Sequence, residues 1–461
     1  MSRLVRVLLL LLALASLANF PVQAQSDDPP VYVVQPGDTL IGIAFRFAIS
    51  ADDLIAVNQI SDPNNLQPGV QLILPGIEGV HGALTTRPVA LGETLRGISR
   101  RYQTPVSTLV RLNHLTSPGE LYAGTTLIMP EEGDLPQMTG QSLLPAGATL
   151  LEQAALLNTG VWTLLAQNDF AAGWQALPGD TLYYPSERSE TSGLIDASIS
   201  GVEIQSLPLI QGKTIEISVK TNQPVELSGS LAGYPLRFVG VAENSFVALT
   251  GIYALADPGL YPILLNGKRA DGSTFNFEQL VRLESGNYIH DPNLVVDPAT
   301  IDPAVTRPEN DQIARITQPF TPERYWQGVF LSPGYDPKWI TSWFGNRRTY
   351  NQDPSVSFHT GLDYGGGIGL PIKAPAAGVV VFAGPLTVRG NATIIDHGWG
   401  VYSGFWHQSK IEVTVGEKVQ PGQEIGLIGG TGRVTGAHLH WEVWVNGVQV
   451  DPLDWLEKEY P

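Results

Sequence analysis

The sequence predicts a multidomain chain that joins α+β and all-β parts, and three observations support this prediction. A short glycine-threonine-leucine pattern recurs every 55 residues near the N-terminus, which indicates three duplicated βααβ units. Short alternating segments follow, and they are typical of a β-sandwich-like middle domain. The C-terminal region is glycine-rich and strand-like, and it holds five of the eight histidines in the chain.

Composition agrees with this layout. A length of 461 residues allows several domains of ordinary size, and 43% hydrophobic residues are enough for packed cores. The formal net charge of -17 argues against a nucleic-acid partner and against binding to anionic membrane surfaces. The chain has no cysteine, so disulfides cannot stabilise any of its domains.

Residues 1–24 have the pattern of a cleaved signal peptide. A basic start precedes an apolar core from Val7 to Leu17, and Val22-Gln23-Ala24 has the small-x-small form of a cleavage site. An uncleaved anchor is the alternative, although the apolar run is shorter than the roughly 20 residues that a membrane span needs. We therefore expect an extracytoplasmic protein, secreted, periplasmic or cell-wall associated, with no membrane span after cleavage.

The 55-residue repeat predicts units at residues 31–76, 87–131 and 142–186. In each unit a short strand leads to a glycine turn, and the following threonine can cap a helix. A second short helix is expected to end near an asparagine, and a closing strand to end at a proline. In the third unit Ala148 replaces an acidic residue, so this copy is diverged. The repeated residues are Thr39, Thr94 and Thr149, Asn58, Asn113 and Asn168, and Pro75, Pro130 and Pro185.

Residues 195–288 are predicted to form the β-sandwich-like middle domain. The stretch Thr214–Lys220 alternates with period two, and further short apolar runs are separated by glycine, proline and asparagine turns. No chemical motif occurs there, so spacing or contact with the next domain is the expected role. Residues 289–316 contain four prolines in a short stretch, which predicts a semi-rigid linker.

Residues 317–461 contain the candidate chemistry. His359 and Asp363 are four residues apart, His438 and His440 are two apart, and His407 lies between the pairs. Side chains at i, i+2 and i+4 of an extended segment share a face, so each pair can converge on an ion. A catalytic zinc typically keeps three protein ligands of the imidazole or carboxylate kind. Four imidazoles and one carboxylate exceed that number by two, which leaves two histidines for proton chemistry.

Each part of this pattern is weak alone, because a single histidine is more often a surface or core residue than a ligand. The two spaced pairs and the third histidine occur in one glycine-rich region, and together they predict a metal site. His397 lies in an Asp-His-Gly turn, and we interpret it as structural.

Two parts of the chain resemble known protein families. Residues from about Trp339 to Pro452 are similar to the lysostaphin-type (LytM-like) zinc metalloendopeptidases, which cut the peptide part of bacterial cell walls. The 55-residue unit resembles the LysM module, a βααβ unit that binds N-acetylglucosamine-containing glycans such as peptidoglycan. The stretches similar to the peptidases are Ile340–Gly345, Phe358–Asp363, Gly390–Gly398, Trp406-His407, Val415–Gly426 and Gly430–Glu442.

The resemblance implies a mostly antiparallel β catalytic domain with one Zn²⁺ ion. His359, Asp363 and His440 match the zinc ligands of the family, and His407 and His438 match its two non-ligand catalytic histidines. Which of these two is the base stays open. Glu442 follows His440 by two residues, and it is either a carboxylate that orients a ligand or a solvated strand residue.

These observations predict a secreted zinc-dependent endopeptidase. It would bind peptidoglycan glycan through the LysM repeats and hydrolyse the peptide cross-links of the wall with a zinc-activated water. The alternative is a non-hydrolytic wall-binding regulator that activates another peptidoglycan hydrolase. Family members of that kind usually lack several of the five site residues, and this sequence keeps them all.

A metalloprotease of proteins is a third option, which the repeats disfavour. A further hypothesis is self-inhibition, in which Thr317–Asp336 covers the groove or His290 takes the open zinc position. The peptide bond cleaved, the Gram type and the oligomeric state stay open at the level of sequence.

Overall fold

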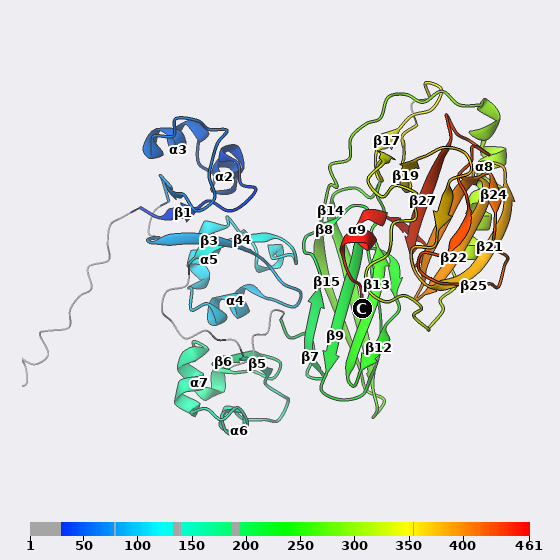
Figure 1. The fold of residues 1–461 in the computed structure, drawn as a ribbon. Helices are drawn as coiled ribbons and strands as arrows, with labels where there is room; N and C mark the ends of the chain where they lie inside the picture. Colours follow the sequence, from blue (N-terminus) through cyan, green and yellow to red (C-terminus); the bar gives the residue numbers. More distant parts are fainter. Residues whose placement is uncertain (1–28, 78–79, 132–137, 139, 187–192, 354) are drawn as a thin grey trace, which may run out of the picture. The chain divides into compact units, whose positions relative to one another are not determined.

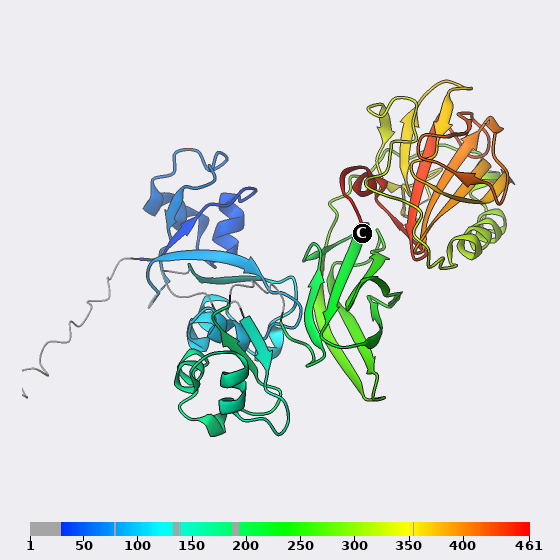
Figure 2. The same cartoon turned by 60° about the horizontal axis from the view of Figure 1, so that its bottom comes forward.

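The computed structural model describes residues 29–77, 80–131, 138, 140–186, 193–353 and 355–461 (Figure 1). The predicted signal peptide at residues 1–24 lies outside these described residues. Short helices and strands alternate up to residue 184, and strands predominate after it, so the protein is mostly β (Figures 1 and 2). In the described ranges, no helix combines the length and apolarity that a membrane crossing requires.

The chain divides into two compact units. The first comprises residues up to Thr86 together with Ser107–His114 and Ile128–Asp134. The second comprises Arg87–Val106, Leu115–Leu127 and Leu135–Pro461.

All three repeats follow the order strand, helix, helix, strand. Thr39, Thr94 and Thr149 cap the first helix of each repeat, as the sequence predicts, because each side chain accepts a backbone N–H of the first turn. The first repeat contains β1 (Val31–Val33), α2 (Leu40–Arg46), α3 (Ala51–Asn58) and β2 (Gln71–Ile73). The second contains β3 (Ala83–Pro88), α4 (Leu95–Arg101), α5 (Val106–Leu112), the 3-10 turn η1 (Pro118–Glu120) and β4 (Thr126–Pro130). The third contains β5 (Gly140–Leu143), α6 (Leu150–Leu156), α7 (Val161–Gln167), η2 (Gly173–Gln175) and β6 (Thr181–Tyr184).

The repeated asparagine joins the second helix to the closing strand. Asn58 donates to the carbonyls of Leu54 and Ile73 and accepts the N–H of Ile73. Asn113 and Asn168 make the same three bonds in their own repeats. One side chain thus satisfies the end of a helix and the edge of a strand, which gives the repeated asparagine a structural role.

Residues 199–284 form two antiparallel sheets with one shared core. Their strand orders are β11-β10-β14-β15-β8, in which β15 and β8 run parallel, and β12-β13-β9-β7. Ile217 from one sheet and Ile263 and Val281 from the other are fully buried in that core. The strands are β7 (Ile199–Ile204), β8 (Leu209–Ile210), β9 (Thr214–Thr221), β10 (Val225–Leu231), β11 (Tyr234–Leu236), β12 (Val239–Ala242), β13 (Ser245–Gly251), β14 (Gly259–Arg269) and β15 (Thr274–Glu284).

The segment predicted as a semi-rigid linker, residues 289–316, differs from that expectation. Its second half is the 15-residue helix α8 (Pro303–Thr317), preceded by the 3-10 turn η3 (Pro298–Thr300). Pro303 occupies the first helical turn, where its missing N–H costs nothing, and Asp302 caps the helix. Pro298 and Pro303 therefore mark the beginnings of helical turns, and Pro308 lies inside α8, so proline content alone does not distinguish this segment from a linker.

The C-terminal region is built on one large antiparallel sheet with the order β16-β19-β27-β23-β22-β21-β25, and β28 pairs with β27. A smaller sheet joins β20, β26 and β24, and β17 pairs with β18. The elements are β16 (Ile340–Ser342), β17 (Arg347–Arg348), β18 (Ser357–Phe358), β19 (Leu362–Gly365), β20 (Pro371–Lys373), β21 (Gly378–Leu386), β22 (Gly390–Gly398), β23 (Val401–Gln408), β24 (Lys410–Ile411), β25 (Lys418–Val419), β26 (Glu424–Leu427), β27 (His438–Val445), β28 (Val448–Val450) and α9 (Pro452–Glu457).

Strand β27 shows how the two faces of this sheet differ. Leu439, Trp441 and Val443 belong to the main hydrophobic core, whereas Trp444 belongs to a second cluster. In that second cluster Ile313 of α8 packs with aromatic residues of the sheet, so the helix covers part of this face (Figure 1). Because side chains alternate along a strand, His438 and His440 lie on the face that α8 partly covers.

Candidate metal centre

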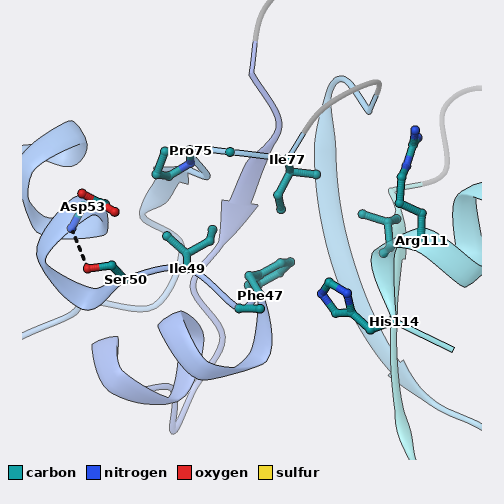
Figure 3. Close-up of a pocket in the computed structure, with 11 residues that line it drawn as sticks. Phe47, Ile49, Ser50, Asp53, Pro75, Ile77, Arg111 and His114 are labelled. Carbon is teal, nitrogen blue, oxygen red and sulfur yellow. Dashed lines mark hydrogen bonds between the residues drawn. The ribbon is translucent and has the colours of Figure 1, made fainter. Parts of the chain in front are cut away.

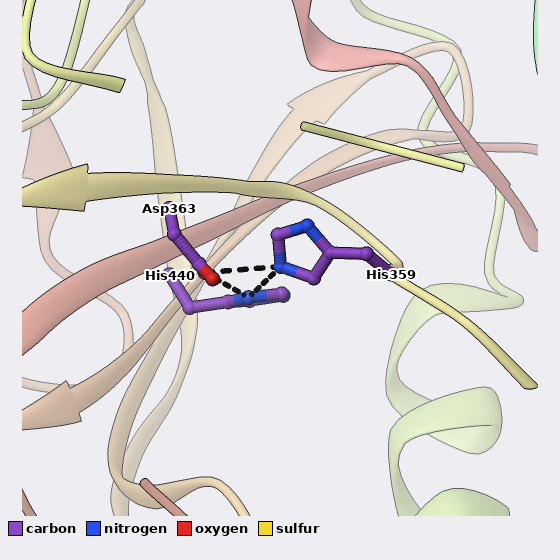
Figure 4. A group of neighbouring side chains, drawn as sticks. All are labelled: His359, Asp363 and His440. Atoms are coloured by element: carbon purple, nitrogen blue, oxygen red, sulfur yellow. Dashed lines mark hydrogen bonds and ion pairs between the residues drawn. The ribbon is translucent and has the colours of Figure 1, made fainter. Parts of the chain in front are cut away.

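Three side chains form a group that could hold a metal ion: His359, Asp363 and His440 (Figure 4). One ligand atom from each lies within 4.8 Å of the others. His359 Nε2 is 3.0 Å from Asp363 Oδ1 and 2.9 Å from His440 Nδ1, and the last two atoms are 2.7 Å apart. These three close contacts place three donor atoms around one point.

The sheet register brings two of these residues together. Asp363 on β19 and His440 on β27 are direct cross-strand partners. His359 lies just after β18 and reaches them through the turn that contains Gly361. A Cβ at Gly361 would overlap the carbonyl of Trp441, so this turn can approach β27 only with glycine at that position.

Hydrogen bonds determine which nitrogen of each imidazole is free to bind a metal ion. His359 Nδ1 lies 2.9 Å from the carbonyl oxygen of Trp343, and a carbonyl can only accept, so Nδ1 donates and Nε2 keeps the lone pair that a metal ion would need. His440 uses the opposite tautomer, because its Nε2 lies 3.0 Å from Glu442 Oε1 and its Nδ1 points at Asp363.

Glu442 is buried, with 2% of its surface exposed, which decides between the two interpretations that the sequence left open. It also accepts from Thr360 Oγ1 at 2.6 Å and from Gln449 Nε2 at 2.8 Å. Burial opposes its charge, but the hydrogen bond from His440 outweighs burial and holds the pKa of Glu442 at about 2. Glu442 is therefore a buried carboxylate that orients His440.

Asp363 has a second polar neighbour. Arg348 Nη2 lies 3.6 Å from Asp363 Oδ2, opposite the side that faces the histidines. Burial raises the pKa of Asp363, but His359 and His440 outweigh this and keep the pKa well below its ordinary value. Arg348, Thr360 and Gln449 are not among the site residues predicted from the sequence. Arg348 and Thr360 lie in or beside stretches that resemble the peptidases, but no local signal marks any of the three as a partner of the metal group.

The two other predicted site histidines flank this group. His438 Nε2 lies 3.6 Å from Asp363 Oδ1, and the rings of His407 and His438 are 4.9 Å apart. Nδ1 of His407 donates to the carbonyl of Thr431 at 2.8 Å, and Nδ1 of His438 donates to the carbonyl of Gly436 at 2.9 Å. Burial first, and the neighbouring His438 and His440 after it, lower the pKa of His407 to about 3.

His397 lies apart from this group, in agreement with its structural interpretation. It donates from Nδ1 to the carbonyl of Ala377 at 2.8 Å, and its Nε2 meets Ser403 Oγ at 2.9 Å. The segment suspected of covering the groove contacts this part of the sheet: Tyr325 N–H bonds the carbonyl of His397, and Trp326 is buried in the main core. His290 pairs with Arg347 through an isolated β-bridge between their backbones.

A separate pocket lies in the first compact unit, with a volume of about 530 Å³ (Figure 3). Phe47, Ile49 and Ile77 supply apolar walls, and Arg111 and His114 lie at one end. Its lining contains none of the five predicted site residues. This pocket is therefore separate from the candidate metal group.

Two regions of the chain match families of known proteins. Residues 357–452 match the family model of peptidase family M23, and residues 32–75 and 89–130 match the LysM domain. The M23 match spans all five predicted site residues.

Named relatives share the C-terminal region. Peptidoglycan DD-endopeptidase ShyA of Vibrio cholerae serotype O1 is 43% identical over 128 residues, 28% of this chain and 30% of ShyA. DD-carboxypeptidase/endopeptidase Mpg of Neisseria meningitidis serogroup B is 43% identical over 95 residues, 21% of this chain and 22% of Mpg. The chain thus matches less than a third of the length of these relatives.

A solved structure of a peptidase M23 from Pseudomonas aeruginosa is 28% identical and covers 54% of this chain and 94% of that one, with a TM-score of 0.39. The sequence matches and the His-Asp-His geometry agree on the same region. The chain therefore carries a peptidase M23 domain at residues 357–452 and LysM domains in its N-terminal region.

Proposed function

We propose that this protein is a zinc-dependent endopeptidase that binds peptidoglycan and hydrolyses peptide cross-links of the bacterial cell wall. The observation that carries the proposal is the convergence of His359, Asp363 and His440, with His407 and His438 beside them. Relatives named as peptidoglycan DD-endopeptidases support cross-links between D-amino acids as the substrate class.

The donor set fits zinc. Two imidazole nitrogens and one carboxylate oxygen form a catalytic set that leaves one coordination position for water or substrate. A zinc ion held there would polarise the scissile carbonyl and make water a nucleophile at neutral pH. The chain holds these donors in place through Trp343, Glu442 and the β19–β27 register.

The remaining two histidines are proposed to handle protons. His407 and His438 each use Nδ1 to bind a backbone carbonyl, so Nε2 is the nitrogen available for the reaction. One of them would take the proton of the attacking water, and one would donate a hydrogen bond to the developing oxyanion or a proton to the leaving amine.

The rest of the chain is proposed to place this site on the wall. The three βααβ units at residues 31–76, 87–131 and 142–186 would act as LysM units that bind the glycan, and tethering would raise the local substrate concentration. Residues 195–288 would form a β-sandwich-like spacer, and residues 317–461 the catalytic domain. Cleavage of a signal peptide at residues 1–24 would deliver the protein outside the cytoplasm.

Digestion of purified peptidoglycan tests this proposal. The full chain loaded with zinc should release new amine ends, identified by mass spectrometry, and a chelator should stop their release. His440→Ala should abolish release while leaving binding to insoluble wall unchanged, since glycan binding is assigned to other residues. Wall binding without new amine ends in the zinc-loaded protein would contradict the enzyme proposal and favour the regulator.

A further inference from the structure

The segment between the two β-rich regions contacts residues that neighbour the candidate site at two points. We call residues 289–317, which end with α8, the strap. Its first half hydrogen-bonds the turns that follow β17, as in the contacts of Asn293 with Gln352 N–H and of Val296 N–H with Asn351. Its two buried or partly buried carboxylates, Asp291 and Glu309, reach further toward the site.

Glu309 binds a backbone loop that it does not neighbour in sequence. Its carboxylate accepts the N–H of Val388 at 2.8 Å and the N–H of Arg389 at 3.1 Å, and it also accepts from Arg389 Nη1 at 3.0 Å. Only 6% of Glu309 is exposed, so these charge-assisted bonds are shielded from water. Glutamine could not reproduce them, because it offers one acceptor oxygen in place of two.

The loop that Glu309 holds is itself bonded to His407. The carbonyl of Arg389 accepts the N–H of His407 at 2.9 Å, and the carbonyl of Val388 accepts the N–H of Arg433 at 2.8 Å. His407 has a φ of 65°, which an L side chain rarely adopts unless surrounding contacts enforce it. The chain of contacts therefore runs from α8 through one loop to the backbone of a site histidine.

Asp291 makes the second contact, through an arginine. Arg348 Nε donates to Asp291 Oδ2 at 3.0 Å, and Asn346 Nδ2 donates to the other oxygen at 2.8 Å. The same guanidinium donates to Ser342 Oγ at 2.7 Å and lies 3.6 Å from Asp363 Oδ2. Asp291 thus fixes the arginine that faces the outer oxygen of a proposed metal ligand.

We propose that the strap positions the catalytic site through two residues. Glu309 positions the backbone of His407, and Asp291 positions Asp363 through Arg348. This inference rests on the proposed function of the site. Both are positioning residues, because neither touches the metal group itself. The two contacts are separate in space and chemistry, so their loss should affect different steps.

Full-length variants test the first contact. Glu309→Gln should speed amide hydrogen exchange in residues 386–391 and 403–409, and should lower kcat on a soluble cross-linked muropeptide about 10- to 100-fold with KM unchanged. Zinc affinity should stay the same. Asp311→Asn removes the same charge from an exposed position on the same helix, and should change none of these quantities.

The second contact predicts the opposite pattern. Asp291→Asn should weaken zinc binding about 10-fold in a chelator competition, since Arg348 would lose its anchor beside Asp363. Exchange in residues 403–409 should stay as in the unmodified chain. Asp311→Asn again serves as the control.

Several outcomes would overturn the inference. One is unchanged exchange and unchanged kcat in Glu309→Gln, and another is a fall in kcat that only matches a fall in the folded fraction. A third is unaltered zinc affinity in Asp291→Asn. If the unmodified chain releases no amine ends, the proposed function fails, whereas the exchange and zinc measurements still decide the role of the strap.

Discussion

His440 lies between two carboxylates, and its two ring nitrogens do different work. Nδ1 faces Asp363 at 2.7 Å, and Nε2 faces Glu442 at 3.0 Å. An imidazole whose second nitrogen is bound by a carboxylate has a fixed orientation and is a more basic ligand. Thr360 and Gln449 donate hydrogen bonds to Glu442, so they fix the carboxylate that orients His440.

We expect Glu442→Gln to weaken zinc binding about 10- to 100-fold. The amide has no negative charge, so it neither fixes the tautomer of His440 as firmly nor raises its basicity. Competition with a chromogenic chelator measures the affinity. Glu457→Gln, at an exposed position on α9, is the matched control and should bind zinc normally. Equal zinc affinities in the two variants would show that Glu442 does not contribute to metal binding.

His397 gives a pH prediction that is independent of metal. Burial lowers its pKa to about 4, so the folded protein disfavours the protonated ring that the unfolded chain accepts near pH 6.5. The stabilisation from neutral His397 is therefore full above pH 6.5 and is lost as the pH falls toward 4. It amounts to about 3 kcal/mol.

The measurement is the free energy of unfolding of the C-terminal region at several pH values. His397→Gln should be less stable at pH 7, because it loses bonds to Ala377 and Ser403. It should also lose less stability than the unmodified chain between pH 6.5 and 4. Parallel pH profiles would show that another group titrates in this range.

At the scale of elements, the repeats are closed by one side chain each. Asn168 is fully buried, and it bonds the carbonyl of Leu164 and both backbone groups of Tyr183. Asn58 makes the same bonds in a half-buried position, where water can replace them. The repeated asparagine should therefore contribute more to the free energy of unfolding in the third repeat than in the first.

We expect Asn168→Ala to cost about 1–3 kcal/mol, because it leaves two buried backbone groups without partners. The amide of Tyr183 should then exchange faster with solvent hydrogen. Asn58→Ala should change the exchange of Ile73 less, since that site is more exposed. A larger effect at Ile73 than at Tyr183 would contradict the dependence on burial.

Helix α8 shows that a proline-rich stretch can be helical where its composition predicts a linker. Proline content indicates a linker, but Pro303 lies in a first helical turn, where proline is favoured. The features that make the segment part of the fold are Ile313, which packs on the sheet, and Glu309, which binds a distant loop. Neither partner is adjacent in sequence, so local pattern could not reveal them.

At the scale of the second compact unit, the middle and C-terminal regions share an ion-pair cluster. Lys213 on the turn before β9 lies 2.8 Å from Asp451 and 2.9 Å from Asp454, at the start of α9. The indole N–H of Trp455 donates to Thr214 Oγ1 at 3.1 Å. These contacts join the two regions through groups that are mostly shielded from water.

We expect Lys213→Met to destabilise this junction by about 1–3 kcal/mol, because it leaves two carboxylates close together without their cation. Faster hydrogen exchange in α9 and in residues 211–214 would report the loss. Lys220→Met removes an exposed lysine from β9 and should leave that exchange unchanged. Equal exchange in both variants would mean that the ion pairs contribute little.

The sequence by itself predicted a mostly β multidomain chain and the order of elements in the repeats. The spacing also predicted a metal site with five candidate residues, and the resemblance to the peptidases indicated which three of them are ligands. These features are local: glycine and threonine mark turns and caps, and short spacings on strands place His438 and His440 on one face. The family match for residues 357–452 covers the same site residues.

Only the tertiary structure decided what surrounds those residues. The burial of Glu442, the pairing of Arg348 with Asp363 and the reach of Glu309 to the loop before β22 join segments far apart in the chain. Sheet register and helix packing determine these contacts, and both depend on the whole core. Residue spacing and the family resemblance predict the residues of the metal group, whereas long-range packing orients them.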